Sequence, residues 1–143
     1  KMTITRKMQQ DLGDQIRQKY GTHVLAKVAV GFMKRDDAVK IIDGIRSPGE
    51  VDYLHKEFGD EFILVAIDAP QDVRFKRVQE RNRDSDPKAF EEFVKLDERD
   101  QGTNEPQYGQ QVKKCIEMAD VVIQNDGNME ELEKKVAEFM KTI

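Results

Sequence analysis

A short polar motif, Asp43-Gly44-Ile45-Arg46, has the residue types of a turn that handles phosphate. The Asp43 carboxylate can hold Mg²⁺ through a water molecule, Gly44 allows close backbone approach, and Arg46 can clamp a phosphate group. A tight turn that leads into a capped helix explains the same residues without a ligand. Both interpretations stay open for the motif taken alone.

Arginines recur on the segment after the second predicted strand, at Arg74, Arg77, Arg81 and Arg83. Arg77 and Arg81 are four residues apart and share one face of a helix. Two guanidinium groups on one face repel each other unless an anion or a carboxylate lies between them. Phosphoryl transfer needs positive charge of this kind. The alternative is a solvated face whose arginines pair with neighbouring acidic residues.

Arg17, with Arg6 earlier on the same predicted helix, is a further candidate phosphate ligand. Surface charge explains these two residues equally well when they are considered alone.

The acidic stretch Asp97-Glu98-Arg99-Asp100 precedes a loop that contains glycines. Carboxylates beside an arginine in such a segment suggest a lid that closes over a site and excludes water. Salt bridges at a helix end are the alternative.

Other chemistries find little support in the residues. His23 and His55 have no carboxylate or cysteine around them at metal-ligand spacing, which disfavours a metalloenzyme. Cys115 lies on an apolar helix face and is expected in the core. None of the nine glycines is followed by lysine, so the sequence contains no Gly-x-x-x-x-Gly-Lys phosphate-binding loop.

Short apolar runs alternate with helical patterns along the chain. We predict helices over residues 5–19, 22–32, 47–58, 73–81, 86–96, 112–118 and 128–140, and strands at Val39–Ile42, Phe62–Ile67 and Val121–Ile123. Such alternation predicts an α/β fold with a parallel sheet. Ligands of these sheets bind beyond the carboxyl ends of the strands. The motif at Asp43 and the polar run at 124–127 lie directly after two of the predicted strands.

The composition fits one domain without a nucleic-acid partner or a membrane span. The chain has 143 residues, of which 36% are charged, and a formal net charge of −4. An acidic chain has no general attraction for nucleic acid, and no apolar run reaches the length of a membrane span. A single cysteine fits a cytoplasmic protein. The oligomeric state is left open.

Taken in order, several stretches resemble P-loop kinases that phosphorylate nucleoside monophosphates or dephospho-coenzyme A, in particular archaeal dephospho-CoA-kinase-like and adenylate-kinase-related proteins. The matching stretches are Gln10–Asp14 with Arg17, Ile42–Ser47, Arg77 with Arg81, Asp97 with Arg99 and Asp100, and Ala119–Ile123 with Asn125. The resemblance implies one domain over 1–143 with a three-layer P-loop kinase-like fold. It also implies acceptor-binding helices at 5–34 and a lid over 84–110.

The resemblance further implies roles for individual residues, ATP as donor and Mg²⁺ as cofactor. Arg17, Gly44 and Arg46 would bind a nucleotide-like acceptor. Asp43, Arg77 and Arg81 would be catalytic, with Asp43 on Mg²⁺ through water. Arg77, Asn125 and Gly127 would border the donor nucleotide, and Asp97, Arg99 and Asp100 would belong to the lid.

The resemblance places a central strand and the phosphate-binding loop before the first residues, Lys1-Met2-Thr3, which are not a usual translation start. We therefore expect upstream sequence and a strand between Val39–Ile42 and Phe62–Ile67. The expected function is an ATP-dependent phosphotransferase when complete. The alternative is a regulatory nucleotide-binding domain, because residues 96–115 also resemble the kinase-like amino-terminal domain of some deoxycytidylate deaminases.

Overall fold

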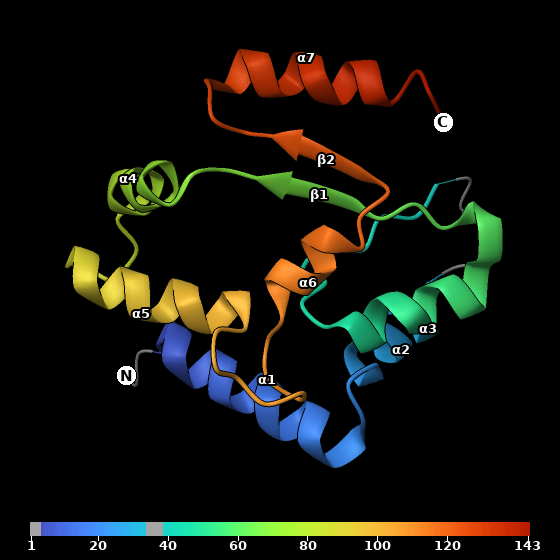
Figure 1. Cartoon of the computed structure of the whole chain (residues 1–143), viewed down its shortest axis with the longest axis horizontal. Helices are drawn as coiled ribbons and strands as arrows, with labels where there is room; N and C mark the ends of the chain where they lie inside the picture. Colours follow the sequence, from blue (N-terminus) through green and yellow to red (C-terminus); the bar gives the residue numbers. More distant parts are fainter. Residues whose placement is uncertain (1–3, 34–38) are drawn as a thin grey trace.

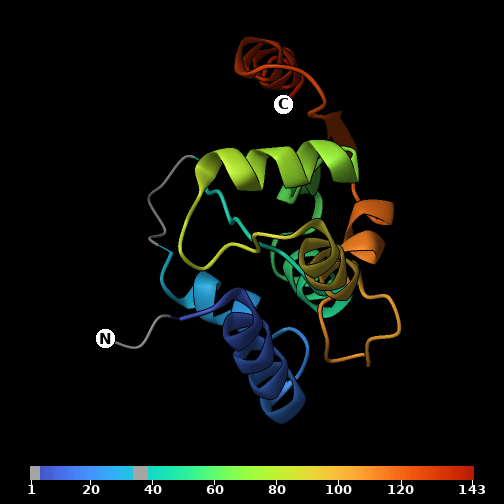
Figure 2. The ribbon, with the colours of Figure 1, turned by 90° about the vertical axis from the view of Figure 1, so that its left-hand side faces the viewer.

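The structure, a computed structural model, describes residues 4–33 and 39–143 and has the predicted α/β class. Its elements in chain order are α1 (Arg6–Tyr20), α2 (Val24–Gly31), α3 (Pro48–Phe58), the 3-10 turn η1 (Gly59–Glu61), β1 (Val65–Asp68), α4 (Gln71–Arg81), α5 (Phe90–Gln101), α6 (Val112–Glu117), β2 (Val121–Gln124) and α7 (Met129–Phe139). Helix α7 lies on one side of the two strands, and α1, α3, α5 and α6 lie on the other (Figures 1 and 2). Residue 34, the last of the expected acceptor-binding segment, lies outside the described residues, as do Lys1–Thr3.

The sheet of the described chain consists of β1 and β2, which run parallel. Val65 lies opposite Val121, and Asp68 lies opposite Gln124 at the carboxyl ends. The crossover between the strands passes through α4, α5 and α6, as parallel pairing requires a long connection. β1 begins later than predicted, at Val65, because the Leu64 N–H just before it donates to the Asp120 carboxylate at 2.8 Å and not to a strand.

The predicted strand at Val39–Ile42 is wrong. Residues 39–47 form neither helix nor strand, and the side chains of Val39 and Ile41 are exposed. Among the described residues β1 pairs with β2 alone, so this β-branched run has no ladder to join. Local β propensity is too weak to form a strand without a pairing partner.

Local capping explains the starts of α3 and α7, and the start of α5 differs most from the prediction. Ser47 precedes α3, and the Glu50 carboxylate accepts the Ser47 N–H at 3.0 Å, as in a capping box. The Asn128 side chain accepts the Glu131 N–H at the start of α7. The helix expected from Asp86 begins only at Phe90, because the Asp86 carboxylate binds residues behind it in the chain.

The apolar core lies between α3, β1 and α6. Val51, Leu64 and Cys115 pack together there, with partly buried Phe62 against them. Burial raises the pKa of the Cys115 thiol to about 12, with the charge of Glu50 adding to the effect. The predicted core position of Cys115 is confirmed, and its thiol is a poor nucleophile at neutral pH.

Buried polar groups lie on α1, α3 and α5 beside this core. Among the described residues, at least as many polar or charged side chains as apolar ones are buried, including Gln10, Asp14, Arg17, Glu50, Asp97 and Asp100. Because buried charges are costly unless paired, each of them constrains its neighbours. No helix within the described ranges is long and apolar enough to cross a membrane.

Candidate functional site

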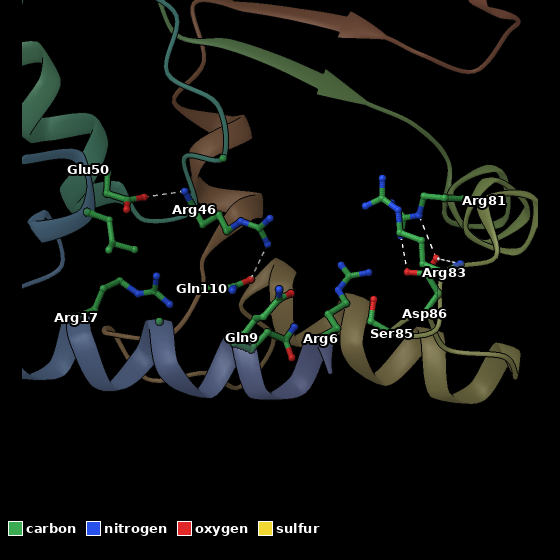
Figure 3. Close-up of a pocket in the computed structure, with 14 residues that line it drawn as sticks. Arg6, Gln9, Arg17, Arg46, Glu50, Arg81, Arg83, Ser85, Asp86 and Gln110 are labelled. Carbon is green, nitrogen blue, oxygen red and sulfur yellow. Dashed lines mark hydrogen bonds and ion pairs between the residues drawn. The ribbon is translucent and has the colours of Figure 1, made fainter. Parts of the chain in front are cut away.

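A pocket of about 600 Å³ lies between α1, the segment before α3 and the end of α4 (Figure 3). Its walls are predominantly polar, and five arginines line it. The lining includes Arg6, Gln9, Gln10, Arg17, Gly44, Arg46, Glu50, Arg81, Arg83, Asp86 and Gln110. These residues come from segments that are far apart in the sequence, so the fold itself assembles the site.

Helix α1 supplies one wall through a single face. Arg6, Gln10, Gly13 and Arg17 succeed one another at spacings of four, three and four residues, which places them on one side of a helix. Arg17 is buried and points from α1 towards Glu50 (Figure 3). Its Nη2 donates to Asp14 Oδ1 at 2.6 Å and its Nε donates to the Tyr108 carbonyl at 2.7 Å. These bonds fix the position of the guanidinium at the pocket wall.

The segment before α3 forms the second wall. Gly44 lies in the left-handed region with φ of +84°, a conformation that favours glycine. The Glu50 carboxylate accepts the backbone N–H of Arg46 at 2.8 Å, which fixes the turn. The Arg46 side chain, 45% exposed, donates from Nη1 to Gln110 Oε1 at 3.3 Å. The backbone of this turn is therefore fixed while much of the Arg46 guanidinium stays accessible.

Asp100 on α5 links three of the pocket residues from behind. Its carboxylate pairs with Arg6, accepts from Gln10 Nε2 at 2.7 Å, and lies 3.7 Å from Arg46 Nη1. The carboxylate is 7% exposed. Asp100 therefore acts as a positioning residue for cations that come from two different segments.

The third wall is the turn after α4. Arg81 donates from Nη2 and Nε to the two oxygens of Asp86, at 2.6 and 3.0 Å. These hydrogen bonds raise the pKa of Arg81 and lower the pKa of Asp86. Asp86 also accepts the Arg83 N–H at 3.1 Å. The Arg83 guanidinium makes no hydrogen bond or ion pair with any residue that the structure describes.

Positive charge dominates the pocket lining. Five arginines face two carboxylates, Glu50 and Asp86, and Asp86 is committed to Arg81. Burial raises the pKa of the Glu50 carboxyl, while the N–H groups of Arg46 and Ser47 and the charge of Arg17 act in the opposite direction. The arrangement is suited to an anion that accepts several charge-assisted hydrogen bonds.

Of the candidate residues named from the sequence, the pocket brings together Arg6, Arg17, Gly44, Arg46, Arg81 and Arg83. Asp43 is exposed and is not part of the pocket lining. Within 4–33 and 39–143, no group of three or more His, Cys, Asp or Glu side chains could hold a metal ion. The role of Asp43 on Mg²⁺ stays a prediction.

The residues expected around a donor nucleotide also lie together, in a different place. Arg77 on α4 donates to the carbonyls of Asn125 and Gly127, at 2.7 and 2.8 Å. These bonds connect α4 to the loop after β2. Both terminal nitrogens of Arg77 are thus used by the protein itself, and their role towards a nucleotide stays a prediction.

The residues expected in a lid lie on α5 and form ion pairs with other helices. Asp97 accepts from Arg74 Nη2 at 2.6 Å, and Arg99 pairs with Asp11 and Asp14 at 2.7 and 2.6 Å. Together with the contacts of Asp100, these pairs connect α5 to α1 and α4.

Sequence reasoning missed Gln10, Glu50, Asp86 and Gln110 as pocket residues. The face of α1 was detectable, because the spacing of Gln10 relative to Arg6 and Arg17 is helical. Glu50 stands three residues after Ser47, where a helix-capping carboxylate is common, and this position gives no sign of a pocket role. The sequence carries no comparable signal for Gln110, which reaches the pocket through a loop.

No protein-family model matches the chain. It is 38% identical over 132 residues to a UPF0200 protein of Thermococcus onnurineus, covering 90% of this chain and 68% of that protein. It is 32% identical over 133 residues to a UPF0200 protein of Pyrococcus horikoshii, covering 90% and 67%. A UPF0200/UPF0201 protein of Archaeoglobus fulgidus is 36% identical over 129 residues, and the chain spans only 38% of its length.

These names correct the resemblance inferred from the sequence. None of them is that of a P-loop kinase, a transferase, an ATP-binding protein or a dephospho-CoA kinase. The assignment to a P-loop kinase family is therefore wrong, and the generic α/β features that suggested it are shared by many folds. The matches extend over nine tenths of the chain and two thirds of relatives that are more than 30% identical. The chain belongs to the UPF0200 family.

Proposed function

We propose that the pocket between α1, the Gly44–Arg46 turn and the end of α4 binds a phosphorylated small molecule. One observation carries this proposal: five arginines from three segments meet at one pocket that contains only two carboxylates. Like charges at this density repel one another, and a multiply charged anion relieves the repulsion. A phosphate group accepts two parallel hydrogen bonds from a guanidinium and carries more than one negative charge, which suits a cluster of several arginines.

The ion pairs behind the pocket support binding rather than simple surface charge. Asp14 holds Arg17, and Asp100 holds Arg6 and Arg46. Side chains fixed before the ligand arrives lose less conformational entropy on binding. In contrast, the Arg83 residue is exposed and its guanidinium is free of hydrogen bonds within the described chain, so it is available to a ligand.

A nucleotide is the first candidate ligand, as expected from the sequence. Phosphoryl transfer with Mg²⁺ and nucleotide sensing without catalysis remain two separate predictions about the consequence of binding. The larger parallel sheet expected for the whole protein is also a prediction. The pocket geometry supports the binding step alone, because its arginines and their carboxylate partners account for anion recognition and for no later step.

The test is isothermal titration of the full chain with pyrophosphate, AMP and ATP, each with and without Mg²⁺. Arg83→Gln and Arg46→Gln should each weaken binding roughly tenfold or more, since a hydrogen bond to a charged group contributes about 1.5–3 kcal/mol. Lys76→Gln is the matched control, because Lys76 lies on the exposed side of α4 outside the pocket. Equal losses in all three variants would show general charge attraction and contradict a specific site. Analysis of the titrated mixtures for ADP would separate turnover from binding.

A further inference from the structure

Gln10 presents a buried hydrogen-bond acceptor at the wall of the arginine pocket. The residue is 2% exposed, and its Nε2 donates to Asp100 Oδ1 at 2.7 Å and to the Leu96 carbonyl at 3.2 Å. Because both partners are acceptors, turning the amide over would place Oε1 against them. The orientation of the amide is therefore fixed. Its Oε1 accepts no hydrogen bond from the described residues.

Glu50 supplies a second acceptor in the same pocket. Its Oε2 accepts the N–H groups of Arg46 and Ser47, at 2.8 and 3.0 Å. No hydrogen bond to its Oε1 is made by the residues that the structure describes. Of these two oxygens, only Gln10 Oε1 is both fully buried and unpaired, while Glu50 lines the pocket and its Oε1 can be reached from it. A buried acceptor needs a donor to offset the loss of its hydration.

A phosphate group cannot meet this need, because its ionised oxygens are acceptors as well. The donor must therefore belong to another part of the ligand. An ammonium group or a metal ion is disfavoured at this place, since five arginines already surround the pocket. A neutral hydroxyl supplies the hydrogen without adding positive charge.

We infer that the ligand is a hydroxylated phosphate ester: its phosphate binds the arginines and its hydroxyl hydrogens are donated to Gln10 Oε1 and Glu50 Oε1. This inference rests on the proposed function and narrows its ligand to the class that includes ribose and other sugar phosphates. Asp100 connects the arginines that would bind the phosphate with the amide that would bind the hydroxyl, because it binds Gln10 as well as Arg6 and Arg46.

The decisive experiment compares AMP with 2′,3′-dideoxyadenosine 5′-monophosphate by titration calorimetry on the unmodified full chain. The two ligands have the same base and phosphate and differ only in the ribose hydroxyls. We expect the dideoxy compound to bind at least about tenfold more weakly, the factor that one unsatisfied buried acceptor produces. Pyrophosphate serves as the probe for the phosphate subsite alone.

The outcomes separate the inference from the proposed function. Equal affinities for AMP and the dideoxy compound would overturn the hydroxyl inference and leave phosphate binding intact. Binding of pyrophosphate without binding of AMP would also overturn it. A chain that binds neither pyrophosphate nor AMP would overturn both statements.

Variants assign the effect to the two acceptors. Gln10→Met removes the amide with a side chain of similar length, and Gln15→Met is its control at an exposed position of α1 outside the pocket. The ratio of the affinity for AMP to the affinity for the dideoxy compound should fall towards one in Gln10→Met. It should stay unchanged in Gln15→Met. Glu50→Gln provides a second variant, with thermal melting to verify folding. A ratio that survives both Gln10→Met and Glu50→Gln would overturn the assignment.

Discussion

Carboxylates hold four of the five arginines at the pocket. Asp14 and Asp86 each bind an arginine of their own chain segment, whereas Asp100 binds Arg6 and Arg46 across the fold. A buried ion pair of this kind contributes little net stability, yet removing one partner leaves an uncompensated charge. The carboxylates therefore matter more for where the guanidinium groups lie than for the stability of the intact protein.

Asp100→Asn should destabilise the protein by roughly 2–3 kcal/mol. Breaking a fully buried ion pair costs more than this. The expected loss is smaller here because the Arg6 side chain is 27% exposed. The amide retains a carbonyl oxygen but loses the charge that Arg6 and Arg46 share. Urea unfolding, monitored by circular dichroism, measures the change in the free energy of unfolding.

Asp126→Asn is the matched control for that variant. Asp126 also pairs with a cation, Lys135, but at 3.3 Å and with both side chains well exposed. Exposed pairs of this kind contribute little to stability. If the two variants are destabilised equally, the positioning role of Asp100 is refuted.

The helices, rather than the sheet, determine the geometry of the candidate site. α1 presents Arg6, Gln10 and Arg17 on one face, and α5 supplies the Asp100 carboxylate behind them. The two strands contribute no residue to the pocket lining. The site is therefore as rigid as the contacts among α1, α3 and α5 permit.

The close approach of α3 to Thr22 is one contact that holds the helices in place, and Gly49→Ala should disrupt it. A Cβ at position 49 would lie 2.9 Å from the Thr22 Cβ and would overlap its hydroxyl. We expect a loss of about 1–3 kcal/mol, the usual cost of overpacking, because α3 would have to move away from α2. The midpoint of urea unfolding checks this value.

Gly31→Ala tests whether the effect is specific to the contact. Gly31 is also helical, and apart from its chain neighbours and its own helix no atom of the described residues lies within 4 Å of a Cβ added there. Replacement of a helical glycine by alanine normally stabilises by up to about 1 kcal/mol. We expect the free energy of unfolding to fall in Gly49→Ala and to rise in Gly31→Ala. A Gly49→Ala variant that is more stable than the unmodified protein would rule out the close approach.

Local patterns in the sequence identified the helices whose first turns are capped by nearby side chains. They failed for elements that form only with a partner from a distant part of the chain. The starts of α3 and α7 were predictable, because Glu50 and Asn128 bond within their own first turns. The strand at Val39–Ile42 was not, since its formation depends on a pairing partner. Arg17, Gly44, Arg46 and Arg81 were predicted individually as ligand-binding or catalytic, but Gln110 reaches them only through the folded loop.

At the scale of the whole molecule, positive charge is concentrated in the pocket although the chain as a whole is acidic. The chain carries a formal net charge of −4, while its pocket is lined by five arginines and two carboxylates. An anion is therefore attracted by this local cluster and repelled by the rest of the surface. Binding of a phosphorylated ligand should depend on the cluster and should stabilise the folded state, which alone assembles it.

Pyrophosphate should accordingly raise the melting temperature of the full chain. A ligand at about one hundred times its dissociation constant stabilises the folded state by roughly 2.7 kcal/mol. For a chain of this size that corresponds to a rise of roughly 5–10 °C. Differential scanning fluorimetry measures the shift, with NaCl at equal ionic strength as the control for screening. The combined variant Arg46→Gln with Arg83→Gln should lose most of the shift, because two accessible guanidinium groups are removed. A rise that NaCl reproduces, or that the combined variant retains, would mean that the stabilisation comes from general screening of charge and not from this pocket.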